Sequence, residues 1–499
     1  MPICTVLVAL FTTSTAPSQP NFVVLIADDL GYGEIAPGAN AAEIPTPSID
    51  AIDDLVFRRA YVTAPNCSPS RAGFLAGQFP TRFGYEFNPV GPRNEHDGIG
   101  LPPEVETLPE ALQKAGYATG LIGKWHLGGT ADYHPHRHGF DRFFGFLHEG
   151  HYFKPYPYDG VTTWLRRAAL PGGRTGRWTR RDSRMVWSDH LGRKEPDYDA
   201  DNPILSDGQP VAEPDYLTDA FTREAVAFIR QHREQPFYLQ LAYSAVHSPM
   251  QALDEDMAAF ESIGDIQRRI FAGMLASLDR SVGQVVAAVD EAGVADRTVV
   301  VFFSDNGGPT AELTSSNAPL RGGKMDMYEG GIRVPMRIDW PAAIPRGNGI
   351  LSDGGSEANA VDAPVSTLDL HETIRGMAAT GGDAKQSRKR RDGLDLRTAD
   401  ETILRTRPLF WRQGTRAALL LGDAKIVRNG PSGDGAAGWE RYDLAEDGDE
   451  ATDLAAAGPS RDGSDEMTSR LAEVWDELNS AMSAPLFGPR AKQRREPRR

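Results

Sequence analysis

The sequence predicts an α/β fold with a large central, mostly parallel sheet flanked by helices, and a small C-terminal α+β subdomain with an antiparallel sheet and a helix. Residues 22–27 form an unbroken apolar run, typical of a strand buried on both faces of a parallel sheet, and further strands are predicted at 118–122, 237–243 and 298–303. Helical patterns occur at residues 107–116, 215–234 and 266–292. Short strand-like pieces follow from residue 407, before a helix near residues 470–482.

Composition sets limits on both architecture and ligands. The chain has 499 residues, of which 40% are apolar, enough for one large domain and a smaller one with a sizeable core. Its formal net charge of −16 opposes nucleic-acid binding, which needs a basic surface. An anionic ligand therefore requires a local basic pocket.

The N-terminus has the pattern of an export signal. Residues 3–11 form a short apolar run followed by small residues, so we expect a signal peptide at 1–17, although a basic first region is missing. The run is too short to span a bilayer, so no stable membrane span is expected. Removing it would leave a periplasmic or secreted protein with Cys67 as its one cysteine and no intramolecular disulfide.

The segment 66–78, NCSPSRAGFLAGQ, contains that cysteine. Pro69 suits the first turn of a helix, so Cys67 is expected at or just before a helix N-terminus, which favours an anion. Arg71 follows four residues later, a spacing that brings both side chains onto one helix face. Either a nucleophile precursor and a guanidinium face the same anion, or Cys67 is a free thiol beside a solvated arginine.

Polar side chains follow the predicted strands where ligands gather in open α/β sheets. Two pairs of oxygen donors occur there, either as metal ligands or as capping residues: Asp28 with Asp29, and Asp305 with Asn306. Hard oxygen donors suit Ca²⁺ or Mg²⁺ and argue against Zn²⁺. Basic residues follow two other strands, either as anion ligands or as ordinary surface and structural residues: Lys124, His126 and His247.

Several motifs in order resemble the type I, formylglycine-dependent sulfatase family of the alkaline phosphatase superfamily, with arylsulfatases and N-acetylgalactosamine-6-sulfatases among its members. The first is CSPSR followed by AGFLAGQFPTR, at residues 67–82. The others are ADDLGYG (27–33), GKWHLG (123–128), SAVHSP (244–249) and PLRGGKMDMYEGGIRVP (319–335). Departures at residues 368–374 and before Tyr61 touch no motif residue.

The resemblance implies an alkaline phosphatase-like fold and a sulfuric ester hydrolase. A maturation enzyme would oxidise Cys67 to formylglycine, whose hydrate attacks sulfur and then expels sulfate after losing a proton to His126. The implied catalytic residues are Cys67, Arg71, Lys124, His126, His247 and Lys324. The implied ligands of a Ca²⁺ ion, with Mg²⁺ as the alternative, are Asp28, Asp29, Cys67, Asp305 and Asn306.

The expected domains are a catalytic domain at 18–405 and a C-terminal subdomain at 406–499. Residues 150–214 read as an irregular insertion, rich in arginine and tryptophan, that either binds a sulfated carbohydrate or pairs its arginines with acidic residues elsewhere. Two other functions stay open: a phosphonate monoester or phosphodiester hydrolase of the same superfamily, and a non-catalytic relative that binds sulfated glycans.

Overall fold

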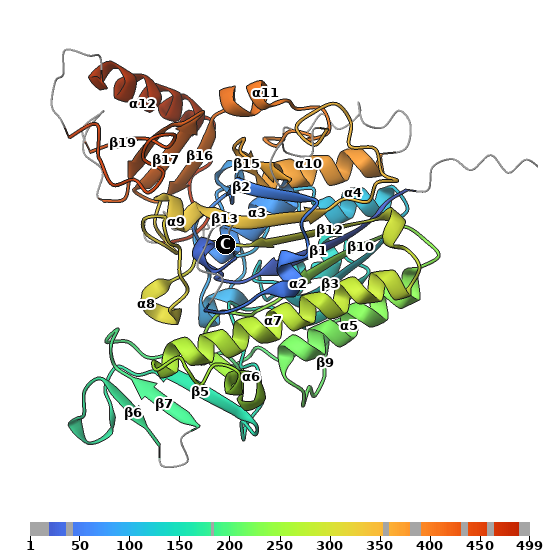
Figure 1. Ribbon diagram of the computed structural model, residues 1–499, viewed down its shortest axis with the longest axis vertical. Helices are drawn as coiled ribbons and strands as arrows, with labels where there is room; N and C mark the ends of the chain where they lie inside the picture. The colour runs from blue at the N-terminus through green and yellow to red at the C-terminus, as the bar shows by residue number, and fades with distance from the viewer. Residues whose placement is uncertain are drawn as a thin grey trace, which may run out of the picture.

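An 11-stranded sheet forms the centre of the molecule, with β15 paired to β2 beside the strand order β14-β2-β13-β12-β1-β10-β3-β4-β8-β9 (Figure 1). The computed structural model describes residues 19–35, 43–180, 184–352, 359–379, 391–430, 438–456 and 464–488, so the expected signal peptide lies outside it. The strands are β1 (Asn21–Ala27), β2 (Leu55–Tyr61), β3 (Ala118–Lys124), β4 (Arg142–Phe146), β8 (Leu205–Ser206), β9 (Gln209–Pro210), β10 (Phe237–Ala242), β12 (Thr298–Ser304), β13 (Arg333–Asp339), β14 (Ala360–Val361) and β15 (Val365–Ser366).

The middle of this sheet is parallel, which confirms the predicted fold class. The parallel strands are β12, β1, β10, β3 and β4, and Leu25 of β1 pairs with Phe302 on one side and Leu241 on the other. Antiparallel pairing begins outside this group, where β13 joins β12 to β2 and β8 joins β4. The carboxyl ends of the central strands therefore share one edge of the sheet.

Helices cover both faces of the sheet. Val23 and Leu25 of β1 pack into one apolar core with α5 (Leu217–His232) and α7 (Ile266–Glu291). The alternate residues of β1 pack on the other face with α3 (Cys67–Ala76), α4 (Leu108–Lys114) and α10 (Thr367–Ala378). This two-sided burial explains why β1 is continuously apolar and why the other central strands are largely apolar rather than alternating.

Residues 150–214 are not irregular as expected, because most of a second sheet forms there. Its order is β11-β5-β7-β6, and it projects from the lower left of Figure 1. Trp164 of β5 pairs with Met250 of β11, a partner far away in sequence that no local pattern reveals. The strands are β5 (Val161–Arg166), β6 (Arg177–Thr179), β7 (Met185–Ser188) and β11 (Met250–Leu253).

The C-terminal subdomain has the predicted antiparallel sheet and helix. Its strands follow one another in sequence, and Phe410 stacks on Trp475 with ring centroids 5.4 Å apart. Its elements are β16 (Leu409–Gln413), β17 (Arg416–Leu421), β18 (Ala424–Arg428), β19 (Glu440–Asp443) and α12 (Ser464–Ser480).

The remaining helices are short. Across the described ranges, no helix combines the length and apolar character needed to cross a membrane. The short α-helices are α1 (Tyr32–Ile35), α2 (Pro47–Asp50), α6 (Asp254–Ala258), α8 (Thr310–Leu313), α9 (Glu329–Ile332) and α11 (Glu401–Thr406). The 3₁₀ turns are η1 (Pro80–Phe83), η2 (Gly91–Glu95), η3 (Ala131–Tyr133), η4 (Pro135–His138), η5 (Pro171–Gly173) and η6 (Ala295–Arg297).

Candidate active site

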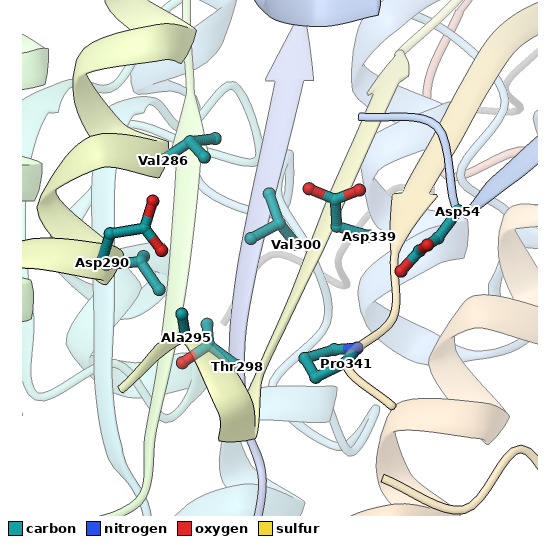
Figure 2. Close-up of a pocket in the computed structure, with 9 residues that line it drawn as sticks. Asp54, Val286, Asp290, Ala295, Thr298, Val300, Asp339 and Pro341 are labelled. Atoms are coloured by element: carbon teal, nitrogen blue, oxygen red, sulfur yellow. The ribbon is translucent and has the colours of Figure 1, made fainter. Parts of the chain in front are cut away.

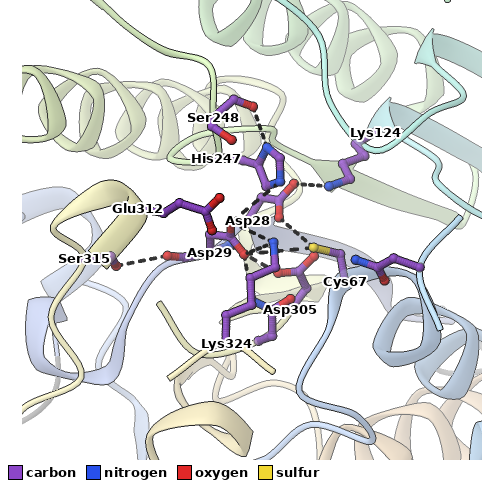
Figure 3. Close-up of polar contacts among 12 residues, drawn as sticks. Asp28, Asp29, Cys67, Lys124, His247, Ser248, Asp305, Glu312, Ser315 and Lys324 are labelled. Carbon is purple, nitrogen blue, oxygen red and sulfur yellow. Dashed lines mark hydrogen bonds and ion pairs between the residues drawn. The ribbon is translucent and has the colours of Figure 1, made fainter. Parts of the chain in front are cut away.

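Four neighbouring strands end at one cluster of polar side chains. Asp28 follows β1, Lys124 ends β3, His247 follows β10 and Asp305 follows β12, and these strands lie in the order β12-β1-β10-β3. Figure 3 shows the four side chains converging on Cys67. Parallel strands bring these separate segments together because their carboxyl ends lie on the same edge.

Cys67 is the first residue of α3, next to the N-cap residue Asn66, as the sequence predicts. Its Sγ lies 3.4 Å from Oδ1 of Asp28 and 3.9 Å from Oδ1 of Asp29. Burial, together with the charges of Asp28 and Asp305, raises the pKa of the Cys67 thiol well above its ordinary value. The unmodified side chain is therefore a neutral thiol at neutral pH and a weak nucleophile.

Asp28 is held among cations. Its Oδ2 lies 2.5 Å from Nζ of Lys124 and 3.6 Å from Nη2 of Arg71. Burial opposes ionisation of this carboxyl, but the positive charges of Lys124 and Arg71 more than offset it, and the pKa of Asp28 is lowered. Asp28 is consequently a permanent carboxylate, available as an oxygen ligand.

Asp305 and Asn306 contribute further oxygen atoms. Arg71 Nε donates to Oδ2 of Asp305 at 2.8 Å, while Oδ1 of Asp305 accepts from the backbone N–H of Asp29 at 3.3 Å. Burial and the charge of Asp28 raise the pKa of Asp305 to about 6. Asn306 Nδ2 donates to Oδ1 of Asp29 at 2.7 Å. The Oδ1 atom of Asn306 is buried without a hydrogen-bond partner among the described residues.

The two predicted histidines lie beside this cluster in different surroundings. His247 Nε2 lies 3.6 Å from Oδ2 of Asp29, and burial lowers the pKa of His247 to about 4. The other ring, His126, shares a hydrogen bond of 2.9 Å between its Nε2 and the carbonyl of Pro89. Burial, followed by the charge of Lys124, lowers the pKa of His126 well below its ordinary value. Both imidazoles are therefore neutral at neutral pH.

Lys324 reaches the cluster from the loop before α9. Its Nζ lies 2.7 Å from Oδ1 of Asp29. The N–H of Lys324 donates to the carbonyl of Gly308 at 3.3 Å, and the N–H of Gly307 donates to the carbonyl of Gly331 in α9 at 3.1 Å. The loop after β12 therefore lies against the loop that carries Lys324 and against α9. A Cβ atom at Gly307 would lie 1.8 Å from the carbonyl oxygen of Gly330, and only glycine permits this approach.

The C-terminal subdomain supports the same loop through a buried ionic group. Lys425 Nζ lies 2.8 Å from Oε1 of Glu329, on α9, and 2.8 Å from Oε1 of Glu450. Burial raises the pKa of Glu450 to about 7. Arg321 also donates to the carbonyl of Glu450 at 3.0 Å. The loop around Lys324 is thus held by β12 on one side and by the subdomain on the other.

Asp28, Asp29, Cys67 and Asp305 form a candidate metal site, because one ligand atom from each lies within 4.8 Å of the others. The carboxylates are hard oxygen donors, and the buried Asn306 Oδ1 lacks a hydrogen-bond partner, as expected of a metal ligand. This donor set fits Ca²⁺ or Mg²⁺ better than Zn²⁺, which prefers His and Cys.

A cleft of about 220 Å³ opens next to the cluster. Asp29, His247 and Lys324, which belong to the cluster, line the part of the cleft that we call its inner end. Sequence reasoning missed most of the remaining lining, because apart from Ser248 and Met325 these residues lie outside the motifs. They are Asn88, Val90, Glu149, Arg166, Arg193, Lys194, Pro196, Tyr198, Ser248, Pro309, Glu312, Leu313 and Met325.

The arginines of residues 150–214 have different environments. Arg166 is buried and pairs with Glu195 and Glu312, whereas Arg177 pairs with Asp265 outside the cleft. Arg184 lies 3.1 Å from Asp254, and Arg181 lies outside the described residues. Trp178 and Trp187 stack on each other with centroids 4.7 Å apart, so each covers a face of the other. The structure thus favours internal pairing for Arg177 and Arg184.

A second cavity, of about 280 Å³, lies at the opposite end of β12 (Figure 2). Asp54, Asp290 and Asp339 line it together with apolar residues such as Val300. Burial and the neighbouring Asp54 raise the pKa of Asp339 to about 6. An acidic lining repels anions, so this cavity does not suit an anionic ester.

The fold and the site are those of a hydrolase of anionic esters, with carboxylates and cations at the strand ends and a buried thiol at the start of α3. The chain belongs to the sulfatase family, because the family model described as Sulfatase matches residues 20–380. It is accordingly a sulfuric ester hydrolase.

Individual relatives agree with this assignment. N-acetylgalactosamine-6-sulfatase of Homo sapiens is 34% identical over 426 residues, covering 83% of this chain and 72% of that protein. Steryl-sulfatase of Mus musculus is 32% identical over 416 residues, covering 73% and 62% of the two chains. The crystal structure of Ps i-CgsB in complex with k-i-k-neocarrahexaose has a TM-score of 0.74 and 29% identity, and 94% of each chain is covered.

Proposed function

We propose that this enzyme removes sulfate from a sulfated carbohydrate by means of a formylglycine made from Cys67 and a bound divalent cation. The observation that carries the proposal is the position of Cys67. Its side chain is buried at the start of α3, 3.4 Å from Asp28, in a cluster that also contains Arg71 and Lys124. A thiol of raised pKa is a poor nucleophile itself, which favours its conversion before catalysis.

The metal ligands in this proposal are Asp28, Asp29, Asp305, Asn306 and the modified residue 67. The preference of Ca²⁺ for several hard oxygen ligands supports Ca²⁺, with Mg²⁺ as the alternative. When bound, the cation would supply positive charge that polarises the nucleophilic hydroxyl and an oxygen of the sulfate ester.

Residue 67 requires a formylglycine-generating or sulfatase-maturating enzyme as a partner. As its hydrate, formylglycine supplies one hydroxyl that takes the sulfuryl group and a second that allows sulfate to be expelled without attack of water on sulfur. Serine at this position would have a single hydroxyl and could not release sulfate by this route.

The surrounding side chains bind the sulfate and transfer protons. Lys124, Lys324 and His247 bind the sulfate oxygens, and Arg71 holds the hydroxyl group of residue 67. His126 accepts a proton from the second hydroxyl as sulfate leaves. Lys324, or His247 once the negative charge of the bound ester stabilises its protonated form, donates a proton to the oxygen of the leaving alcohol. Positively charged side chains therefore surround the sulfuryl group and stabilise its negative charge during transfer.

A sulfated carbohydrate is the substrate class that the relatives support. The human relative is named for a sulfated amino sugar, and the similar Ps i-CgsB structure contains a neocarrahexaose. We assign residues 18–405 to the catalytic domain, 150–214 to an insertion that contributes to substrate recognition, and 406–499 to the C-terminal subdomain. The pattern at residues 1–17 supports export to the periplasm or secretion.

The test compares ester classes on one leaving group. A 4-nitrophenyl sulfate, the matching phosphonate monoester and the matching phosphodiester are hydrolysed by metal-loaded wild-type protein and by C67A. We expect the highest kcat/KM on the sulfate and no turnover by C67A. A higher kcat/KM on either phosphorus ester would instead identify a phosphonate monoester or phosphodiester hydrolase.

A further inference from the structure

One wall of the cleft is formed by the segment 193–198, which belongs to the inserted sheet region. Arg193, Lys194, Pro196 and Tyr198 line the cleft there, and His247 and Lys324 line its inner end. In the proposed function the sulfate occupies the inner end, so groups attached on its alcohol side lie in the rest of the cleft, which this wall partly lines.

A buried network fixes this wall to the catalytic domain. The N–H of Glu195 donates to the carbonyl of Arg166 at 3.1 Å, and Arg166 Nε donates back to Oε1 of Glu195 at 2.7 Å. Tyr198 donates to Oε2 of Glu195 at 3.0 Å and shares a hydrogen bond of 2.9 Å with Ser248. Ser248 directly follows His247, so the wall has a fixed position relative to that histidine.

The cations on the wall differ in their partners. Arg166 is neutralised by Glu195 and Glu312, and Arg193 Nη2 lies 2.9 Å from Oε1 of Glu312. Lys194 is exposed and has no acidic partner within the described part of the chain. Arg193 contacts Glu312 through Nη2, and its guanidinium has further N–H donors that can bind another anion. Two carboxylates thus balance Arg166 and Arg193, and Lys194 is the cation of this wall that no carboxylate of the described ranges pairs with.

We propose that Lys194 and Arg193 bind a second anionic group, carried on the carbohydrate part of the substrate at a distance from the sulfate that is removed. This inference rests on the proposed function and specifies its substrate class as a carbohydrate with at least two anionic groups. A carboxylate and a second sulfate ester share the chemistry required, since each offers oxygen acceptors to an ammonium and a guanidinium. A neutral sugar would leave Lys194 unpaired.

The experiment measures kcat/KM on three carbohydrate esters with the same scissile sulfate. One has a neutral neighbouring sugar, one a uronic acid in that place and one a second sulfate ester. For wild-type holoenzyme we expect a higher kcat/KM on one or both dianionic substrates, with a preference that shrinks as salt concentration rises. The substrate with the larger preference identifies the second group as carboxylate or sulfate.

The variant K194Q should lower this preference about tenfold or more, the effect of one charge-assisted hydrogen bond. K194R should retain most of it, because the charge remains. The matched control is K114Q, which removes the same charge from an exposed lysine on α4 and should leave the preference unchanged.

Two negative results have different meanings. If wild-type protein hydrolyses all three esters with equal kcat/KM, or if K194Q keeps the full preference, the second anion site is refuted while sulfatase activity stands. If wild-type holoenzyme hydrolyses none of them but cleaves a sulfate ester of another class, the carbohydrate assignment itself is refuted.

Discussion

Lys124 and Asp28 form a completely buried ion pair, with Nζ of the lysine 2.5 Å from Oδ2 of the aspartate. The two residues come from β3 and the end of β1, strands that are separated in the sheet by β10. Burying two charges is expensive and contributes little to stability unless other partners compensate. A role for the lysine charge in the site therefore explains this buried pair better than a contribution to stability does.

The variant K124M tests that role. We predict a fall in kcat of about 10²–10³, the usual effect of removing one group that stabilises charge in a transition state. Circular dichroism at the assay temperature establishes that the protein is folded. K114M, an exposed lysine changed in the same way, is the control. A kcat for K124M within threefold of wild type would remove Lys124 from the mechanism.

From the cluster of Asp28, Asp29 and Asp305 we predict that the purified protein contains a divalent metal ion. Elemental analysis of purified wild-type protein should find stoichiometric Ca²⁺ or Mg²⁺, and D305A should lose bound metal and activity together. D339A is the control, because Asp339 lines the acidic cavity at the other end of β12. Stoichiometric zinc, or full activity after exhaustive chelation, would contradict the assignment.

Asp339 predicts a dependence of stability on pH. Its pKa is about 6 in the folded protein against an ordinary value of 3.8, so the folded state binds more protons between these values and stability falls as pH rises through this window. D339N removes the unfavourable charge and keeps an acceptor for the N–H of Asp53. We predict that D339N is more stable than wild type by about 1 kcal/mol at pH 8, after discounting for partial exposure.

Thermal melts of both proteins at pH 4 and pH 8 check this prediction. At pH 4 the carboxyl is largely protonated, so the two melting temperatures should nearly coincide. An equal gain at both pH values would show that the effect of D339N does not come from ionisation.

The buried ionic group of Lys425, Glu329 and Glu450 should contribute to the stability of the protein. K425M leaves Glu329 and Glu450 buried without their shared cation, which should reduce the free energy of unfolding by about 3–5 kcal/mol. E450Q should be much milder, because Lys425 and Glu329 still neutralise each other. Urea unfolding monitored by fluorescence measures both. If K425M unfolded at the wild-type urea concentration, the subdomain would not support the loop through this group.

The convergence of the site is predictable from sequence, and the reason is topological. Asp28, Lys124, His247 and Asp305 each follow an apolar run of the kind that forms a parallel strand, and parallel strands end on one edge. Lys324 follows no such strand, so the match of its loop to the family motif was needed to include it.

The cleft wall could not be predicted in this way. The polar stretch that contains Arg193, Lys194 and Tyr198 is positioned by the pairing of β5 with β11. These two strands are more than eighty residues apart in the sequence. The antiparallel orientation of β13 relative to β12 could not be predicted either. A buried strand such as RVPMRID has the same composition whether it runs parallel or antiparallel to its neighbour. Local patterns identify elements, whereas long-range pairing determines which loops meet.

The most direct test of the central claim is the state of residue 67 in active protein. Preparations made with and without a formylglycine-generating enzyme are compared by peptide mass spectrometry and by specific activity on a sulfate ester. We predict that activity is proportional to the fraction of formylglycine at position 67 and extrapolates to zero when only cysteine is present. Full activity in a preparation that contains only unmodified Cys67 would contradict the proposed mechanism.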